Sequence, residues 1–335
     1  MTDSAGLASI VLSMLRLRSL VLLFTLALSA LCSHAQQAAP IIVDTDVGDD
    51  VDDAFAIDLV LASPELRVLG LSSAWGDTAL RAQMLDRMAC EVGKGVPVHA
   101  GVPTQSSATF SQAPWAKAGI KREHGDAVAF LLDQIKAHPG QITLLALGPL
   151  TNLGAAIDRD PVTFRKLKRI VLMGGSIHRG YGAAGAPVEP EYNIVRDPKA
   201  AQKVFRAGVP IFMFPLDSTQ IKFDASRRSQ LTTISTPMTD ALQVLLAEWS
   251  HTTGKADETL FDAVAAAYAI DPSSCPVTPL HVEVDDKGMT LATPGTPNAE
   301  VCLVPQEKMF FALLMPRLLN QRLVGDKVCL APSAK

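Results

Sequence analysis

The sequence lacks four features that would indicate other classes of protein: a C-x-x-C pair, a basic stripe, an acidic tail and an internal repeat. Without a C-x-x-C pair, a zinc or thiol redox site is not expected. The net charge is only −4, and without a basic stripe the sequence gives no indication of nucleic-acid binding. Hydrophobic residues make up 48% of the chain and charged residues 19%, which is typical of a globular protein with a large core.

Residues 1–35 have the pattern of an export signal. Arg16 and Arg18 precede an almost wholly apolar run over residues 20–31, and Ser33-His34-Ala35 supplies the small residues that a signal peptidase recognises. The apolar run is shorter than the roughly 20 residues of a membrane span, which argues against the alternative of an uncleaved anchor. We predict a signal peptide over 1–35, a mature domain over 36–335, no membrane attachment after cleavage, and a periplasmic or secreted protein.

Export changes the interpretation of the cysteines. Cys32 would leave with the signal, so that four cysteines remain in an oxidising compartment: Cys90, Cys275, Cys302 and Cys329. Because Cys302 and Cys329 both lie in the C-terminal segment, we expect them to pair. Separate buried thiols are the alternative.

Short apolar runs alternate with helical patterns, which predicts an α/β fold. The predicted strands cover 41–43, 68–74, 96–100, 142–147, 169–173 and 209–214, and the predicted helices 53–62, 79–92, 126–138, 151–158, 197–207, 237–250 and 260–270. Uninterrupted apolar strands are typical of parallel sheets buried on both faces. We expect a single open, mostly parallel, Rossmann-like sheet flanked by helices, followed by a small hairpin over 281–292 and a last helix over 308–319.

An acidic segment follows the first predicted strand. Six carboxylates fall within ten residues, in the run Asp44-Thr45-Asp46-Val47-Gly48-Asp49-Asp50-Val51-Asp52-Asp53. In open α/β sheets the ligand crevice lies at the carboxyl ends of the strands, where so many like charges repel one another unless a cation lies among them. A hard cation with oxygen ligands would meet that need. The alternative is a solvated loop in which Asp52 or Asp53 caps the next helix.

This segment resembles the D-x-D-x-G-x-D-D-A signature of the inosine-uridine preferring nucleoside hydrolases, with two extra residues after Gly48. Further segments resemble the family in the same order: Trp75-Gly76-Asp77, Leu147-Gly148-Pro149-Leu150-Thr151-Asn152, Met173-Gly174-Gly175, Glu191-Tyr192-Asn193 and Leu260-Phe261-Asp262. Together they cover nearly all of the predicted mature chain. The resemblance implies the fold of that family and hydrolysis of the N-glycosidic bond of ribonucleosides to ribose and free base.

The resemblance also implies a metal site. Ca²⁺ would be bound by Asp46, Asp53, Asp262 and the backbone carbonyl of Leu147. Asp46 would act as the general base that takes a proton from a metal-activated water, a role that a carboxylate beside a cation can fill.

A second set of residues would bind the sugar according to the same resemblance. Asp52, Asp77, Glu191 and Asn193 would contact the ribose hydroxyls, and Met173 would pack against the ring. Each has an ordinary structural alternative. Asp77, for example, stands where it could cap the helix that follows, and Met173 could simply belong to the core.

The chain departs from the family at Phe261, where many members carry a His that is implicated in protonating the departing base. Phe cannot donate a proton. Phe261 could instead stack on the base together with Trp249 or Tyr181, or it could be part of the core. His178 and His251 are other possible proton donors. Gly185 also stands where the family has an Asn six residues before its conserved Glu, which leaves one ribose contact in doubt.

Two other functions stay open on the residues alone. An apolar strand followed by Asp-x-Asp also opens the haloacid-dehalogenase-type Mg²⁺ phosphatases, although Gly48 stands where they carry Thr or a similar residue. A non-catalytic Ca²⁺-dependent riboside-binding protein would explain Phe261 but would not require Asp46. The resemblance implies a small-molecule nucleoside as partner and suggests a homodimer or homotetramer, while the natural nucleoside stays open.

Overall fold

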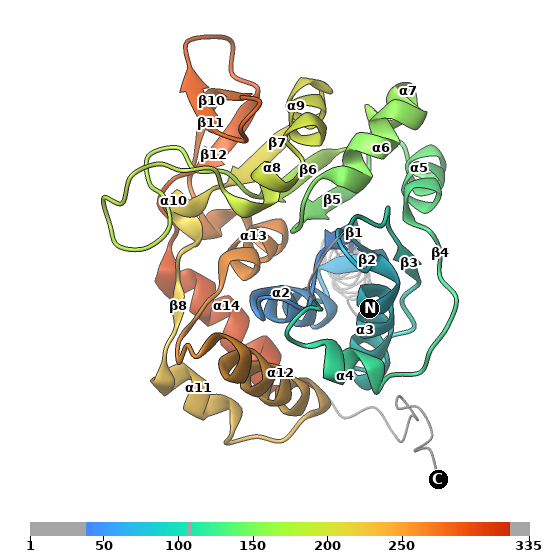
Figure 1. Cartoon of the computed structure of the whole chain (residues 1–335), viewed down its shortest axis with the longest axis vertical. Coiled ribbons are helices and arrows are strands. Elements are labelled where there is room, and N and C mark those ends of the chain that lie inside the picture. Colours follow the sequence, from blue (N-terminus) through green and yellow to red (C-terminus); the bar gives the residue numbers. More distant parts are fainter. Residues whose placement is uncertain (1–37, 106–108, 322–335) are drawn as a thin grey trace, which may run out of the picture. The chain divides into compact units, whose positions relative to one another are not determined.

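The computed structural model describes residues 38–105 and 109–321, in which a ten-stranded sheet forms the centre (Figure 1). Its strands, in spatial order, are β11 (Thr290–Thr293), β10 (Val277–Val284), β12 (Ala299–Cys302), β7 (Ile211–Phe214), β6 (Arg169–Met173), β5 (Thr143–Ala146), β1 (Ala39–Thr45), β2 (Leu66–Ser73), β3 (Val98–Ala100) and β4 (Gly125–Asp126). All neighbouring pairs from β12 to β4 are parallel, and β10 pairs antiparallel with both β11 and β12. The predicted open, mostly parallel sheet is confirmed.

Both faces of the central strands are buried, because successive side chains of a strand point to opposite faces and apolar runs such as residues 41–43 fill both. Ile41 and Val43 of β1 belong to one hydrophobic cluster, whereas Ile42 belongs to the other. The first cluster includes α2 (Asp52–Leu61), α3 (Thr78–Glu91), α4 (Ala113–Lys117), α12 (Pro237–Thr253), α13 (Phe261–Ile270) and α14 (Glu307–Leu319). The second includes α5 (Ala127–Ala137), α6 (Thr151–Arg159), α7 (Pro161–Phe164) and α9 (Pro198–Arg206).

The remaining elements are short. They are the helices α8 (Tyr192–Arg196), α10 (Leu216–Thr219) and α11 (Ala225–Leu231), the 3-10 turn η1 (Pro272–Ser274), and a separate antiparallel pair formed by β8 (Lys222–Phe223) and β9 (Glu258–Thr259). The predicted C-terminal hairpin is confirmed as β10 and β11, and the predicted last helix as α14. β12 was not among the predicted strands, and it joins this hairpin to the parallel part of the sheet through β7.

The predicted disulfide between Cys302 and Cys329 is wrong, because Cys302 pairs with Cys275. The antiparallel register of β10 and β12 places Val277 opposite Cys302. That register brings Cys275 close enough to bond, with a Cα–Cα distance of 5.9 Å. Cys329 and the predicted signal peptide over 1–35 lie outside the described residues. In the described ranges, none of the helices has the length and apolar character that a membrane crossing requires.

Candidate active site

One cavity of about 550 Å³ opens where the parallel strands end. It is lined by Asp46 after β1, Trp75 after β2, Leu147 after β5 and Met173 at the end of β6. Four neighbouring strands thus deliver one lining residue each to the same edge of the sheet. This is the position at which open α/β sheets bind their ligands.

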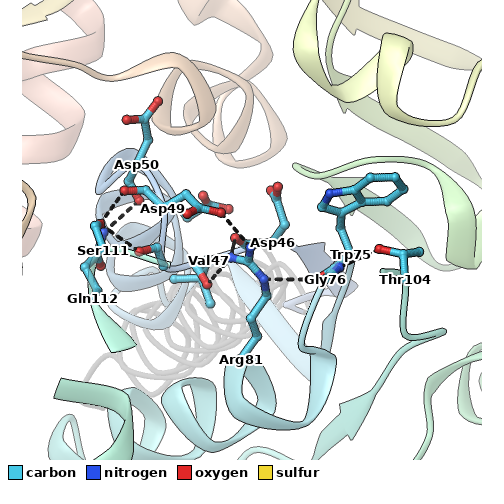
Figure 2. Close-up of polar contacts among 12 residues, drawn as sticks. Asp46, Val47, Asp49, Asp50, Trp75, Gly76, Arg81, Thr104, Ser111 and Gln112 are labelled. Carbon is cyan, nitrogen blue, oxygen red and sulfur yellow. Dashed lines mark hydrogen bonds and ion pairs between the residues drawn. The ribbon is translucent and has the colours of Figure 1, made fainter. Parts of the chain in front are cut away.

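Arg81 organises the acidic loop that forms one wall of the cavity. Its guanidinium donates to the carbonyl oxygens of Asp46 and Val47, the latter at 2.8 Å, and its Nη2 meets the Asp49 carboxylate at 2.6 Å. Its Nε donates to the carbonyl oxygen of Trp75 at 3.0 Å. Figure 2 shows the guanidinium between the acidic loop and the Trp75 segment. Because Arg81 is buried, it fixes the loop with charge-assisted hydrogen bonds that solvent screens little.

Two glycines allow the loops to approach closely. Gly48 has a φ of +129°, and a Cβ there would lie 2.5 Å from the ring of Phe110. A Cβ at Gly148 would lie 2.8 Å from Oδ1 of Asp46. A larger residue at Gly148 would push the acidic loop away from the end of β5, and one at Gly48 would push the loop away from Phe110, so both glycines have a direct steric role.

Asp52, Asp53 and Asp262 form a buried group in which one carboxylate oxygen of each lies within 4.8 Å of the others. Asp52 and Asp53 are the first residues of α2, and Asp262 is the second residue of α13. The backbone N–H of Asp262 donates to Oδ2 of Asp52 at 3.0 Å, and the hydroxyl of Thr45 donates to Asp53. Two helix N-termini therefore bring these acids together, although Asp262 is far from the others in sequence.

Arg81 balances only part of the electrostatic repulsion within this group, because its charge lowers the pKa of Asp46 and of Asp53 while both stay raised. Burial and the charge of Asp53 raise the pKa of Asp46 well above its usual range, and burial and Asp52 do the same for Asp262. For Asp53, burial raises the pKa to about 6, although hydrogen bonds from Thr45 and Asp262 oppose the shift. Carboxylates that converge in this way repel one another unless a positive charge lies among them. A hard divalent cation with oxygen ligands would supply that charge.

The residues predicted to contact ribose line the cavity, with one exception. Glu191 accepts hydrogen bonds from the backbone N–H groups of Gly175 and Asn193, both at 2.9 Å, and burial raises its pKa to about 7. The amide of Asn193 donates to the carbonyl oxygen of Leu147 at 2.9 Å and to that of Met173 at 3.2 Å. Glu191, Asn193, Met173 and Leu147 all line the cavity.

Asp77 is the exception. Its side chain is exposed and does not line the cavity. Its Oδ1 accepts a hydrogen bond from the backbone N–H of Leu80 at 3.0 Å, so the carboxylate caps α3. The structure therefore favours the capping alternative for Asp77 over a ribose contact.

Comparisons with known proteins decide the family. The model of the inosine-uridine preferring nucleoside hydrolases matches residues 41–312. The chain belongs to this family. It is accordingly a hydrolase that acts on N-glycosyl compounds, and the family match does not favour the haloacid-dehalogenase alternative.

The relatives differ in the base that their names specify. The chain is 30% identical over 264 residues to the pyrimidine-specific ribonucleoside hydrolase RihB of Escherichia coli O17:K52:H18, which covers 73% of this chain and 82% of that protein. A plant nucleoside hydrolase, PpNRh1, superposes with a TM-score of 0.75 at 26% identity, covering 84% of this chain and 99% of the other. A purine-preferring ribonucleoside hydrolase from Gardnerella vaginalis gives 0.71 at 25% identity, with 84% and 98% covered.

Aromatic residues of this family member form a further part of the cavity wall. Phe261 and Tyr181 both line the cavity, and their rings meet edge to face with centroids 6.1 Å apart. Trp249, the other proposed stacking partner, is buried outside the cavity lining, and its indole N–H donates to Asp50 at 2.9 Å. His178 and His251 do not line the cavity either.

Several residues of the site were not singled out from the sequence. Arg81 resembles any basic residue of a surface helix, although its neighbours Thr78 and Ala82 in α3 are also buried. Asn152 appeared only within a motif, yet its amide donates to Asp44 at 2.7 Å and to the carbonyl of Ser73 at 2.9 Å, which ties β1 to β2. Arg196 lies at the cavity with its guanidinium 4.5 Å from the ring centre of Tyr192.

Proposed function

We propose that this protein hydrolyses the N-glycosidic bond of ribonucleosides, giving ribose and the free base, and that it requires Ca²⁺. The observation that carries the proposal is the buried carboxylate group of Asp52, Asp53 and Asp262, which adjoins Asp46 at the wall of a cavity large enough for a nucleoside. The family membership supports the same reaction.

The metal site would use oxygen donors alone. We assign Asp46, Asp53, Asp262 and the backbone carbonyl of Leu147 to Ca²⁺, and Asp52 is close enough to Asp53 and Asp262 to add an oxygen. Ca²⁺ accepts six to eight oxygen ligands, which leaves positions for sugar hydroxyls. When bound, the cation would make water more acidic and would stabilise negative charge in the site.

Asp46 is the residue that we assign to proton transfer. Its carboxylate lines the cavity, and Arg81 fixes its backbone through the carbonyl oxygen. A carboxylate in this position can accept the proton of a water that attacks the anomeric carbon of the sugar. Arg81 does not itself line the cavity, so its contribution is to position Asp46 rather than to contact the substrate.

Glu191 and Asn193 would orient the ribose. The oxygens of Glu191 accept three backbone N–H groups, the third from Ile194 at 3.2 Å, so this carboxylate cannot change rotamer without losing them. These three bonds leave one of its lone pairs, which a sugar hydroxyl would use in place of the Tyr181 side chain. We also assign Asp52 and Met173 to the sugar site, because both line the cavity.

The departing base would meet the aromatic pair of Phe261 and Tyr181. Position 261 holds Phe instead of His or another proton donor. This residue can therefore bind the base but cannot protonate it as it leaves. Stacking of a base on Phe261 favours large flat bases over small ones. We therefore infer a preference for purine nucleosides.

The compartment and the assembly are further proposals. The predicted signal peptide indicates a periplasmic or secreted protein, and the Cys275–Cys302 disulfide supports an oxidising compartment. A role in nucleoside salvage is proposed from the resemblance to the family. A homodimer or homotetramer is proposed from the resemblance to the family.

A panel of purine and pyrimidine nucleosides tests the substrate assignment. The chain lacking residues 1–35 would be incubated with each nucleoside in excess Ca²⁺, and released ribose would be measured. We expect hydrolysis with a higher kcat/KM for purine nucleosides. Binding of nucleosides without release of ribose would instead support a riboside-binding protein.

A further inference from the structure

A second group of carboxylates lies beside the one assigned to Ca²⁺. Asp50, Asp52 and Glu258 each offer an oxygen, and these oxygens lie within 4.8 Å of one another. Asp50 belongs to the acidic loop, Asp52 begins α2, and Glu258 comes from β9. The fold thus adds to the acidic motif a carboxylate that is about 200 residues away in sequence.

Glu258 is the member of this group that needs a ligand most. Its side chain is only 2% exposed, and its Oε2 has no hydrogen-bond partner. Its Oε1 accepts the backbone N–H of Thr259 at 2.7 Å. Among the described residues it forms no ion pair, and the nearby Lys222 donates to the hydroxyl of Thr259 at 2.6 Å instead. A buried carboxylate oxygen without a partner is costly, so an unmatched Oε2 points to a bound species.

Asp50 and Asp52 are each held in place by one hydrogen bond to a carboxylate oxygen. The indole N–H of Trp249 fixes Oδ1 of Asp50, and the backbone N–H of Asp262 fixes Oδ2 of Asp52. Each carboxylate keeps a second oxygen. Figure 2 shows the Asp50 side chain pointing away from Arg81, so that Arg81 does not compensate its charge. Asp50 and Asp52 both line the cavity, which gives an ion a route to the group.

We propose that Asp50, Asp52 and Glu258 bind a second hard divalent cation, with Asp52 between this ion and the one at Asp53 and Asp262. Asp52 belongs to both carboxylate groups, so one residue can contact both ions. A single divalent cation, Arg81 and the lysines near Glu258 (Lys222 and Lys255) together carry fewer positive charges than the acidic side chains gathered here: Asp46, Asp49, Asp50, Asp52, Asp53, Glu258 and Asp262. The second ion offsets the excess.

The number of bound ions tests this proposal independently of catalysis. Equilibrium dialysis with Ca²⁺ as the probe would be run on the chain lacking residues 1–35. We expect two ions per wild-type chain and one in Glu258→Gln, which keeps the size of the side chain and removes its charge. Glu283→Gln, on the exposed face of β10, is the matched control and should bind two. One ion in the wild type, or two in Glu258→Gln, would overturn the proposal.

Tb³⁺ luminescence provides a second readout that does not depend on the Glu258 variant folding. Because the indole of Trp249 contacts Asp50, excitation of tryptophan should sensitise Tb³⁺ bound at the second site. We expect Trp249→Phe to lose most of this signal, whereas Trp75→Phe should retain the part that comes from Trp249. An unchanged signal in Trp249→Phe would contradict the site. A protein that binds two ions but cleaves no nucleoside would refute the proposed hydrolysis and leave this inference intact.

Discussion

The side-chain amide of Asn193 donates a hydrogen bond to the carbonyl oxygen of Leu147 at 2.9 Å. The first residue was predicted to contact ribose and the second to bind the metal, so this bond links the two parts of the proposed site. Its donor belongs to α8 and its acceptor follows β5.

Asn193→Asp tests this link. The substitution keeps the size of the side chain but removes the N–H donor and places a carboxylate against the carbonyl of Leu147. Residues that orient metal ligands typically affect metal affinity by about 10- to 100-fold. We therefore expect the Ca²⁺ affinity of the variant, measured by calorimetry, to be about 10- to 100-fold lower than that of the wild type. An unchanged dissociation constant would show that the orientation of Leu147 does not depend on Asn193.

Arg81→Met tests the anchor of the acidic loop. The variant keeps an apolar side chain of similar length and loses the hydrogen bonds to the carbonyls of Asp46, Val47 and Trp75, together with the contact to the exposed Asp49 carboxylate. At about 1 kcal/mol for each of the three carbonyl bonds, we expect the free energy of unfolding in urea to fall by roughly 3 kcal/mol.

Arg159→Met is the matched control for that measurement. Its ion pair with Asp126 joins two side chains that are 49% and 52% exposed, and pairs of this kind contribute less than about 1 kcal/mol. An equal loss in both variants would contradict the role given to Arg81.

Phe261→Leu tests the contact with the base. Leucine keeps the apolar character of the position and removes the ring that meets Tyr181. Aromatic contacts contribute about 0.5–1.5 kcal/mol beyond buried area, which corresponds to a loss of roughly 2- to 12-fold in kcat/KM for purine nucleosides. The loss for pyrimidine nucleosides should be smaller. Equal losses for both classes would argue against stacking at this position.

Asp58 gives a prediction for the pH dependence of stability. This residue of α2 lies in the core, where burial raises its pKa well above the ordinary value of 3.8. The folded chain therefore keeps a proton that the unfolded chain releases. The stability from this group is present in full below about pH 3.8 and is lost as the pH rises through the folded pKa.

Asp58→Asn removes that titration. Compared with the variant, the wild type should lose roughly 1.4 kcal/mol of unfolding free energy per pH unit within that window. Urea unfolding of both proteins at pH 5 and pH 7, with the same Ca²⁺ concentration, measures the difference. A gap that does not change with pH would show that Asp58 is already ionised in the folded chain.

Much of the fold could be predicted from local patterns. The strands β1, β5 and β6 each contain a continuous apolar run because both faces of a parallel sheet are buried. β12 was missed because it is short and contains Glu300, so it has neither an unbroken apolar run nor a clear partner in sequence. The Cys275–Cys302 pair depends on the register between β10 and β12, which the spacing of cysteines does not reveal.

The candidate site could be predicted only where its residues fall into motifs. Asp46, Asp53 and Asp262 lie in segments that resemble the family, and the structure brings Asp53 and Asp262 within one carboxylate group beside Asp46. Arg81 and Glu258 lie outside those segments, and only the folded chain brings them to the acidic loop. Asp77 shows the opposite case, since it lies in a motif but caps a helix.

The rate of ribose release with and without Ca²⁺, compared between the wild type and Asp46→Asn, tests the central claim most directly. Loss of a general base typically lowers kcat by about 10²- to 10⁴-fold, so we predict a loss of that size in Asp46→Asn and no release by the wild type after chelation. Asp133→Asn, an exposed charge change on α5, should keep wild-type activity. Equal ribose release before and after chelation, or full activity in Asp46→Asn, would contradict the account.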